Sequence, residues 1–342
     1  MKRNVKIMLQ LLPAIVVAAA VFIYLLSFVP LPDGRMARSV ALVERVAYYR
    51  ICADGRTVAW FGSLGDSLSA DGLVLPGDSA AVSRGYANGV WVDKYPFFPS
   101  CPGLMLVAWG DSLQRVRLSA AAAGPRAVVE RAVARLAADS MPRVRRLGEL
   151  DYYMRVHNVN DDGYNVMAER AAAERTANAA ADSLLRLLRG ASAARSLTVE
   201  RVTAYTLLYN DTAGNVCRKA CAVLAEDMSG GFALLQTADR EKPSGAVSLY
   251  LHQWLMPESD TGDSITVAAM AGCASYGYSP SVVRPVLTGG AADGRGGHDV
   301  PPLLAPDGAA VFSRYGWFEG FSMGGRIVRP CRFGYGLKHL LP

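Results

Sequence analysis

Short apolar runs separated by turn-forming residues make up most of the chain after residue 40. Runs rich in β-branched and aromatic residues, bounded by Gly and Asp, predict strands. In the first half we predict strands at residues 46–52, 57–61, 72–75, 89–92 and 104–109. In the second half we predict them at residues 203–208, 217–225, 232–236, 246–251, 265–270, 282–287, 310–312 and 317–322. Many strands this short are typical of a sandwich or a barrel.

Between these two stretches the apolar residues change to helical spacing. Residues 125–195 are rich in Ala, Arg, Glu and Leu, which are good helix formers. Val129, Val133 and Leu136 recur at helical intervals, and the polar segment 157–165 interrupts the pattern further on. We therefore predict an insert of two or three helices packed as a hairpin.

One apolar stretch, residues 7–29, is long enough to cross a membrane as a helix. Lys2, Arg3 and Lys6 lie on its N-terminal side only, which predicts that residues 1–6 stay in the cytoplasm and the rest is exported. A cleaved signal peptide is the alternative, but the apolar run of such a peptide is usually only ~7–15 residues. We expect a single-pass protein of the cytoplasmic membrane, with its C-terminal domain in the periplasm if the cell is bacterial.

The formal net charge is +6, and half of it comes from the three basic residues before the apolar stretch. No run of Lys and Arg is interleaved with aromatic residues, so we predict no nucleic-acid partner. All six cysteines follow the apolar stretch, where export permits disulfides, but their pairing does not follow from the sequence. Cys217 and Cys221 have no second pair at metal spacing, so we predict no metal site. The Gly-rich stretch 289–297 lacks the strand–turn–helix setting of a dinucleotide-binding loop, so we predict no cofactor.

Two short motifs resemble the nucleophile turns of esterases. GFSMGG, residues 320–325, places Ser322 in a G-x-S-x-G pattern, but no acidic residue follows it and Pro330 leaves little room for the required helix. GDSL occurs at residues 65–68 and 110–113, without the D-x-x-H that would supply its base and acid. We interpret the first motif as a plain β-strand that ends in two glycines, and both GDSL copies as turns.

Residues 158–169 resemble the calcium-binding loop of an EF-hand and lie between predicted helices. Asparagine replaces the usual aspartate at the first position, and a second asparagine stands where an apolar residue is normal. Because Asp and Asn also cap helices and Gly ends them, a capped inter-helix turn is the default interpretation and calcium binding the alternative. The matching residues are Asn158, Asn160, Asp162, Gly163 and Glu169.

Four longer segments carry motifs in an order that one protein family shares. They are SLSADGLVL at 67–75, the strand–turn–strand segment ending in FALLQT at 203–237, GDSITVAAMAG at 262–272, and APDGAAVFSRYGWFEGFSM at 305–323. In this order they resemble segments of bacterial trypsin-like serine proteases of the degradative, chaperone-protease type. The resemblance covers most of the predicted strands beyond the apolar stretch.

The resemblance implies a mainly β fold with an α insertion. Two trypsin-like β-barrels would follow the N-terminal transmembrane helix, with a helical hairpin inserted in the first barrel. The first barrel would comprise residues 40–123 and 197–240, the insertion residues 124–196, and the second barrel residues 245–335.

The resemblance also implies where a catalytic triad would lie. The family's histidine position corresponds to Ser79 within VLPGDSAAV, its aspartate position to Gly231 before FALL, and its serine position to Asp307 before GAAVF. None of these residues has the required chemistry, because a triad needs an imidazole base, a carboxylate that orients it and a nucleophile. The resemblance therefore implies a homologue that has lost the triad and acts as a binding or scaffold module for a peptide or an envelope protein.

A rearranged hydrolase site is the main alternative. His298 and Asp299 follow the Gly-rich stretch 289–297, which we predict to be a flexible loop, and Ser322 or Ser313 could approach them. The default expectation is that His298 is exposed to solvent. An active envelope peptidase or esterase would need it within hydrogen-bond reach of a serine and oriented by a carboxylate. A structural envelope protein with no enzyme ancestry is the third alternative.

Overall fold

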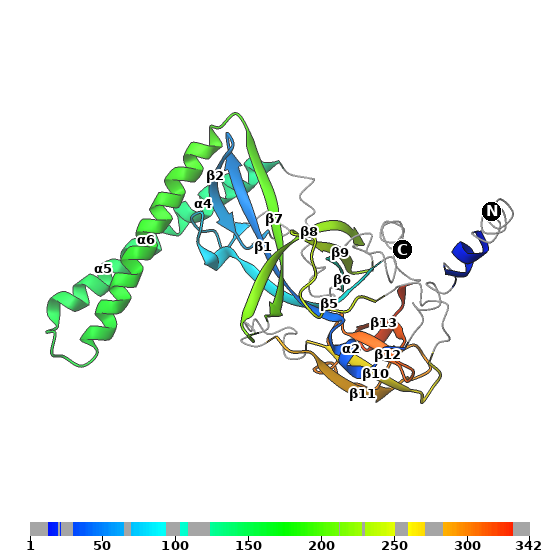
Figure 1. The fold of residues 1–342 in the computed structure, drawn as a ribbon. Coiled ribbons are helices and arrows are strands. Elements are labelled where there is room, and N and C mark those ends of the chain that lie inside the picture. Colours follow the sequence, from blue (N-terminus) through cyan, green and yellow to red (C-terminus); the bar gives the residue numbers. More distant parts are fainter. Residues whose placement is uncertain are drawn as a thin grey trace. The chain divides into compact units, whose positions relative to one another are not determined.

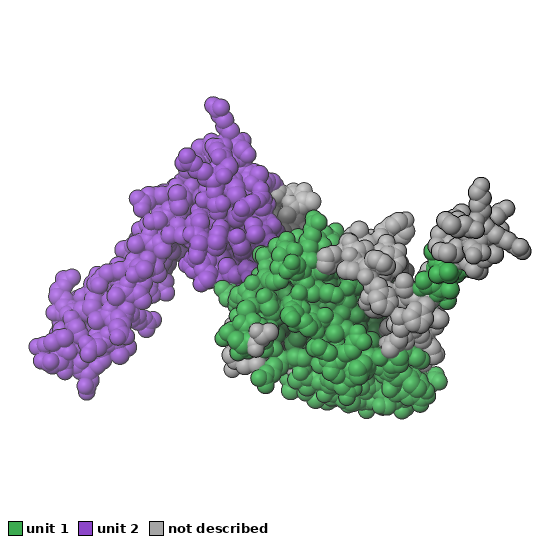
Figure 2. Space-filling view, in the orientation of Figure 1, with its two compact units in different colours: residues 1–45, 84–115, 204–342 green, residues 46–83, 116–203 purple. Residues whose placement is uncertain are grey.

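A computed structural model describes residues 13–19, 21, 30–64, 70–93, 103–108, 124–211, 213–227, 230–249, 259–270 and 283–330. The chain divides into two compact units, coloured separately in Figure 2. Unit 1 comprises Met1–Arg45, Arg84–Arg115 and Ala204–Pro342, and unit 2 comprises Val46–Ser83 and Val116–Thr203.

A seven-stranded sheet closes on itself through six of its strands (Figure 1). The strand order is β2-β1-β5-β6-β9-β8-β7, and β1 also pairs with β7, so that β2 alone lies outside the ring. The strands are β1 (Val40–Ala53), β2 (Arg56–Phe61), β5 (Ser83–Trp91), β6 (Leu104–Ala108), β7 (Leu197–Asn210), β8 (Val216–Asp227) and β9 (Phe232–Thr237).

Strand β6 shows why this barrel forms. Its five residues, LMLVA, are all buried, as expected for a strand that is covered on both faces. Met105 and Val107 pack in a cluster with residues from all the other strands of the ring, which fills the barrel interior. Leu104, Leu106 and Ala108 point to the opposite face and pack in a second cluster outside the barrel.

A second sheet of unit 1 has the strand order β11-β10-β12-β13-β14. Residues 296–299 lie between its two outermost strands: His298 bridges to Ala292 beyond β11, and Gly297 bridges to Arg326 of β14. These bridges complete a ring around a separate apolar cluster, which includes Ile265, Val267, Val311 and Ile327. The strands are β10 (Ser264–Ala269), β11 (Val286–Ala291), β12 (Ala310–Ser313), β13 (Phe318–Met323) and β14 (Arg326–Val328).

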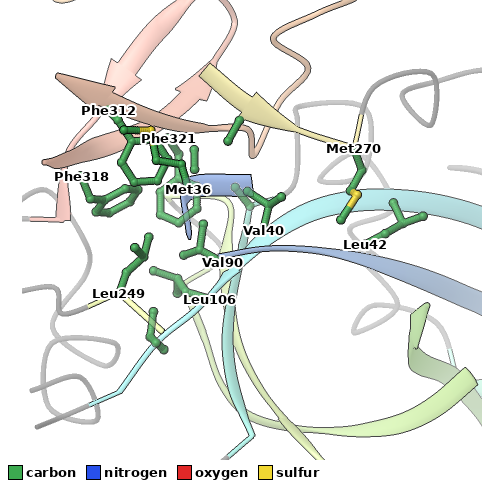
Figure 3. Packing of buried hydrophobic residues seen from close by; sticks show 14 of the residues in the cluster. Met36, Val40, Leu42, Val90, Leu106, Leu249, Met270, Phe312, Phe318 and Phe321 are labelled. Atoms are coloured by element: carbon green, nitrogen blue, oxygen red, sulfur yellow. The ribbon is translucent and has the colours of Figure 1, made fainter. Parts of the chain in front are cut away.

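One apolar cluster joins the two sheets of unit 1 (Figure 3). Phe312, Phe318 and Phe321 from the second sheet pack beside Val90 and Leu106 from the first. The ring centroids of Phe318 and Phe321 are 5.4 Å apart in an edge-to-face arrangement, which aromatic pairs favour. The short helix α2 (Asp33–Ala37) contributes Met36 to the same cluster.

Unit 2 contains the predicted helical insert as three helices. They are α4 (Pro125–Ala138), α5 (Ser140–Val156) and α6 (Tyr164–Ser192), and both α4 and α5 pack on α6 (Figure 1). Pro142 does not break α5 because it lies in the first turn, where its missing N–H costs nothing. The short pairing of β3 (Ser63–Leu64) with β4 (Ala70–Asp71) completes the unit, together with a single 3₁₀ turn (Ser79–Ala81).

Several sequence expectations need correction. The stretch 289–297 is not a loop throughout, since β11 extends to Ala291 and pairs with β10 over its whole length. Glycine suits this strand because a Cβ at Gly290 would lie 2.3 Å from Cγ2 of Val300. The strand predicted at 72–75 is only an isolated bridge between Trp60 and Val74.

Most of the apolar stretch 7–29 lies outside the described residues, which there are 13–19 and 21. Among the described residues, no helix combines the length and the apolar character needed to cross a bilayer. Three of the cysteines, Cys52, Cys217 and Cys221, are described, and all three are free thiols.

Candidate functional site

The turn before β12 holds Asp307, at the position where the resemblance places a nucleophile. Oδ1 of Asp307 accepts a hydrogen bond from the backbone N–H of Gly324 at 2.7 Å. The next residue, Gly308, has a φ of 85° and donates its N–H to the carbonyl of Ser322 at 2.9 Å. The Asp307 carboxylate thus ties this turn to the turn that follows β13.

Only glycine fits the position after Asp307. A Cβ on Gly308 would lie 2.5 Å from the carbonyl oxygen of Asn88 and 3.0 Å from that of Ala108. Oδ1 of Asn88 in turn accepts a hydrogen bond from the N–H of Met270 at 2.7 Å. The turn that carries Asp307 is therefore packed closely against the first sheet and fixed in position.

The other two positions implied by the resemblance are a glycine and a serine. Gly231 has a φ of 74° and donates its N–H to the carbonyl of Asp227, in the turn between β8 and β9. Ser79 is exposed and begins a 3₁₀ turn, which Asp78 caps by accepting the N–H of Ala80. Ser79 belongs to unit 2, whereas Gly231 and Asp307 belong to unit 1, and their convergence on one cleft stays a prediction.

The structure brings His298 and Ser322 together. Nε2 of His298 lies 2.8 Å from Oγ of Ser322, and both side chains are buried in the second sheet. His298 comes from the bridging segment 296–299 and Ser322 from β13, next to β14. The expectation that His298 is exposed to solvent was wrong, because the Gly-rich stretch is held in the ring and not free.

The hydrogen bonds of this pair differ from those of a catalytic triad. Oγ of Ser322 also lies 3.2 Å from the carbonyl oxygen of Ala305, which can take its only proton. Nδ1 of His298 is buried, and no carboxylate of the described residues forms a hydrogen bond with it. In a triad that nitrogen donates to a carboxylate, which fixes the tautomer of the ring.

Asp299 does not supply this carboxylate, since its Oδ1 accepts the backbone N–H of Ala291 at 2.7 Å. Burial lowers the pKa of His298 below its ordinary value of 6.5. Three groups raise this pKa without reversing the shift: the carboxylates of Asp299 and Asp293, and the backbone of Val300. The lowered pKa favours the neutral form of the imidazole over the charged form.

The interpretation of GFSMGG as a strand is confirmed. Its first four residues belong to β13, and Gly324 and Gly325 form the turn to β14 with φ values of 58° and 76°. Both GDSL copies, at residues 65–68 and 110–113, lie outside the described residues.

The EF-hand-like segment folds as a turn between α5 and α6. Asp161 caps the turn by accepting the N–H of Asn158 at 2.8 Å, and Gly163, with a φ of 85°, precedes the first residue of α6. Among the described residues, no group of three or more His, Cys, Asp or Glu side chains is arranged to hold a metal ion.

One polar cluster was not anticipated from the sequence. Nζ of Lys242 lies 2.7 Å from Oδ2 of Asp93 and 2.5 Å from Oγ of Ser248, and the aspartate and the serine are buried. Lys242 donates to both oxygens, and its contact with Asp93 is a salt bridge. The cluster clamps the chain after β9 to the end of β5, and only the three-dimensional pairing of these distant residues shows it.

Comparisons with known proteins give limited likenesses. No known family profile matches the chain, and no curated protein matches its sequence. Among solved structures, Deg5 aligns with 12% identity over 85% of this chain and 81% of its own, at a TM-score of 0.32. The MamO protease domain from Magnetospirillum magneticum aligns with 10% identity over 36% of this chain and 68% of its own, at a TM-score of 0.25. At these TM-scores neither likeness bears on function.

Proposed function

We propose that this chain is a trypsin-like protease homologue without catalytic activity, which binds a peptide or protein partner in the cell envelope. The observation that carries the proposal is the engagement of Asp307. At the position where the family resemblance expects a nucleophile, a carboxylate accepts the N–H of Gly324 instead. A carboxylate held in this way stabilises the turn and offers no hydroxyl for acyl transfer.

The arrangement of unit 1 supports the fold part of the proposal. A closed six-strand barrel packs against a second ring-like sheet through a common apolar cluster, as two barrels of a trypsin-like protein would. The binding part rests on the family resemblance, because a cleft that no longer cleaves can still accept an extended chain along a strand edge.

An active hydrolase built on His298 and Ser322 is the second candidate, and their 2.8 Å hydrogen bond favours it. Two observations weigh against this candidate. Ser322 exposes none of its surface, so that a substrate carbonyl has no described path to Oγ. Nδ1 of His298 also lacks the orienting carboxylate that a base of this kind needs.

We also propose that residues 7–29 anchor the protein in the cytoplasmic membrane with residues 30–342 on the outer side. The support is the uncharged apolar stretch with basic residues on one side only. Membrane fractions should retain the full chain after carbonate washing, whereas a variant that begins at residue 30 should be released.

Binding and cleavage can be measured in one experiment with fluorescein-labelled casein, an unfolded polypeptide. We expect the purified chain to raise the anisotropy of the probe without producing fragments on a gel. Fragments that disappear in Ser322→Ala would instead support the second candidate. Neither binding nor fragments would contradict the binding part of the proposal.

A further inference from the structure

The chain packs onto unit 1 directly after the apolar stretch, which ends at Val29. Leu31 is only 9% exposed, and its backbone N–H donates to the carbonyl of Gly316 at 3.0 Å. Met36 of α2 is buried in the same apolar cluster as Phe318 (Figure 3). The segment 31–36 is therefore fixed on unit 1 and is not a loose linker.

The segment 31–36 meets the turn between β12 and β13 at Gly316. This residue has a φ of 80°, and an added Cβ would lie 3.0 Å from the backbone nitrogen of Leu31 and from Cε of Met36. Two backbone hydrogen bonds of 2.8 Å close the turn: Gly316 donates to Ser313, and Ser313 donates to Trp317. Because the approach is so close, only glycine fits there, and the turn and the segment are held together.

The exposed side of this turn combines aromatic rings with a cation. Tyr315 is half-exposed, and its ring centroid lies 5.1 Å from that of Trp317. The guanidinium of Arg314 lies 4.6 Å from the centroid of the Tyr315 ring and donates to its hydroxyl at 2.6 Å. Arg314 also forms a salt bridge with Asp263 at 3.3 Å, yet half of its side chain stays exposed. Tyr, Trp and Arg, each with an apolar body and a polar end, suit the interface between a membrane and water.

Chain length sets how far this turn can lie from a membrane that residues 7–29 cross. Leu31 follows Val29 by two residues, which span at most about 7 Å. The headgroup layer on each side of the hydrocarbon core is about 5–8 Å thick. With Val29 at the end of the membrane-spanning segment, Leu31 and its partner Gly316 lie within that layer or at its outer edge. Tyr315 precedes Gly316 directly and lies at the same height.

We propose that the turn 313–317 contacts the phospholipid headgroups of the membrane that the same chain crosses, and that the segment 31–36 holds it there. This rests on the anchor proposed above for residues 7–29. Tyr315 places its ring between the headgroups, and Arg314 donates to their phosphate oxygens. Unit 1 then stands on the membrane in one orientation, whether or not it binds or cleaves a peptide.

Quenching by a phospholipid with a spin-labelled headgroup tests the contact. The full chain is reconstituted in vesicles of phosphatidylcholine and phosphatidylglycerol with the label in both leaflets, so that the direction of insertion does not matter. Tyr315→Trp places a fluorophore on the turn, and Val216→Trp, at an exposed position of β8, is the matched control. We expect the label to quench the emission added by Tyr315→Trp severalfold more than that added by Val216→Trp. Equal quenching would overturn the proposal.

Carbonate washing of the same vesicles separates a failure of the contact from a failure of the anchor. A chain that is retained without extra quenching at position 315 would overturn the contact alone. A chain that is washed out would overturn the anchor and this proposal with it.

A linker variant tests the role of the segment 31–36. A Gly/Ser linker of about 12 residues, inserted between Val29 and Pro30, spans about 20 Å and leaves the anchor in place. We expect it to reduce the quenching of Tyr315→Trp to the level of the control. Quenching that the linker leaves unchanged would contradict the part of the proposal that assigns this role to the segment.

Discussion

Nε2 of His298 and Oγ of Ser322 meet at 2.8 Å inside the ring formed by the second sheet. The two residues are 24 positions apart, and the bridging segment 296–299 brings them together. A serine beside a histidine is a familiar sign of a nucleophile. Here the burial of both side chains, the nearby carbonyl of Ala305 and the missing carboxylate make the pair a polar part of the core.

We expect Ser322→Ala to destabilise the protein by about 1–3 kcal/mol, because it leaves a buried ring nitrogen of His298 without its partner. Urea unfolding, followed by far-UV circular dichroism, measures the change. Ser244→Ala, at an exposed serine, is the control and should unfold with the parent. Equal midpoints for Ser322→Ala and the parent would show that the hydrogen bond contributes nothing.

The stability of the fold should depend on pH through His298. Its pKa is lowered in the folded chain, so below pH ~6.5 the unfolded chain binds a proton that the folded chain excludes. The free energy of unfolding therefore falls as the pH drops through 6.5, and it levels off once the folded ring is protonated as well. In His298→Gln this part of the pH dependence should vanish, and an unchanged difference between pH 8 and pH 5 would refute the assignment.

Gly308→Ala should destabilise unit 1 by about 3 kcal/mol. The new methyl group would meet two backbone carbonyl oxygens at 2.5 and 3.0 Å, and the positive φ adds strain. Gly324→Ala is the matched control, since its φ is also positive but its Cβ would stand in open space. We expect only about 1 kcal/mol there. Similar losses in the two variants would mean that the close packing of the Asp307 turn is not maintained in solution.

Glu44 is the most deeply buried carboxylate among the ion pairs that the structure describes in unit 1. It accepts from Arg218 at 2.7 Å and lies 4.0 Å from Arg84, and its side chain is only 2% exposed. Glu44→Ala should cost about 1–2 kcal/mol, because it removes a buried acceptor of Arg218 and Tyr86, whereas the half-exposed arginines stay solvated.

The control for Glu44 is Glu200→Ala, which breaks an exposed pair with Arg50. Exposed pairs contribute under about 1 kcal/mol. Differential scanning calorimetry of the two variants at low and moderate salt measures the contrast. If Glu200→Ala proves the more damaging change, the ranking of these ion pairs by burial is wrong.

The strands that the sequence predicted best are those with continuous apolar runs. LMLVA and FALLQT stand out because burial on both faces removes polar residues from them. Residues 289–291 were misassigned as loop because glycine usually weakens a strand, whereas here the close approach of Val300 requires it at Gly290. A preference inferred from residue type alone cannot include a neighbour that is distant in the sequence.

The candidate site shows the same limit. The sequence analysis grouped His298, Asp299 and Ser322 as a possible hydrolase site. Their burial and hydrogen bonds could not be predicted, because they depend on the bridges that close the second ring. The clamp of Asp93, Lys242 and Ser248 left no local signal at all, because its members come from separate segments of the chain.

Labelling by a fluorophosphonate probe tests the central claim most directly, since such probes react with activated serine hydroxyls. We predict that the folded parent chain takes up no probe, because the only described serine with a histidine partner is buried in the second sheet. Labelling of the parent that is lost in Ser322→Ala and kept in the control Ser313→Ala would contradict the account and identify an active hydrolase.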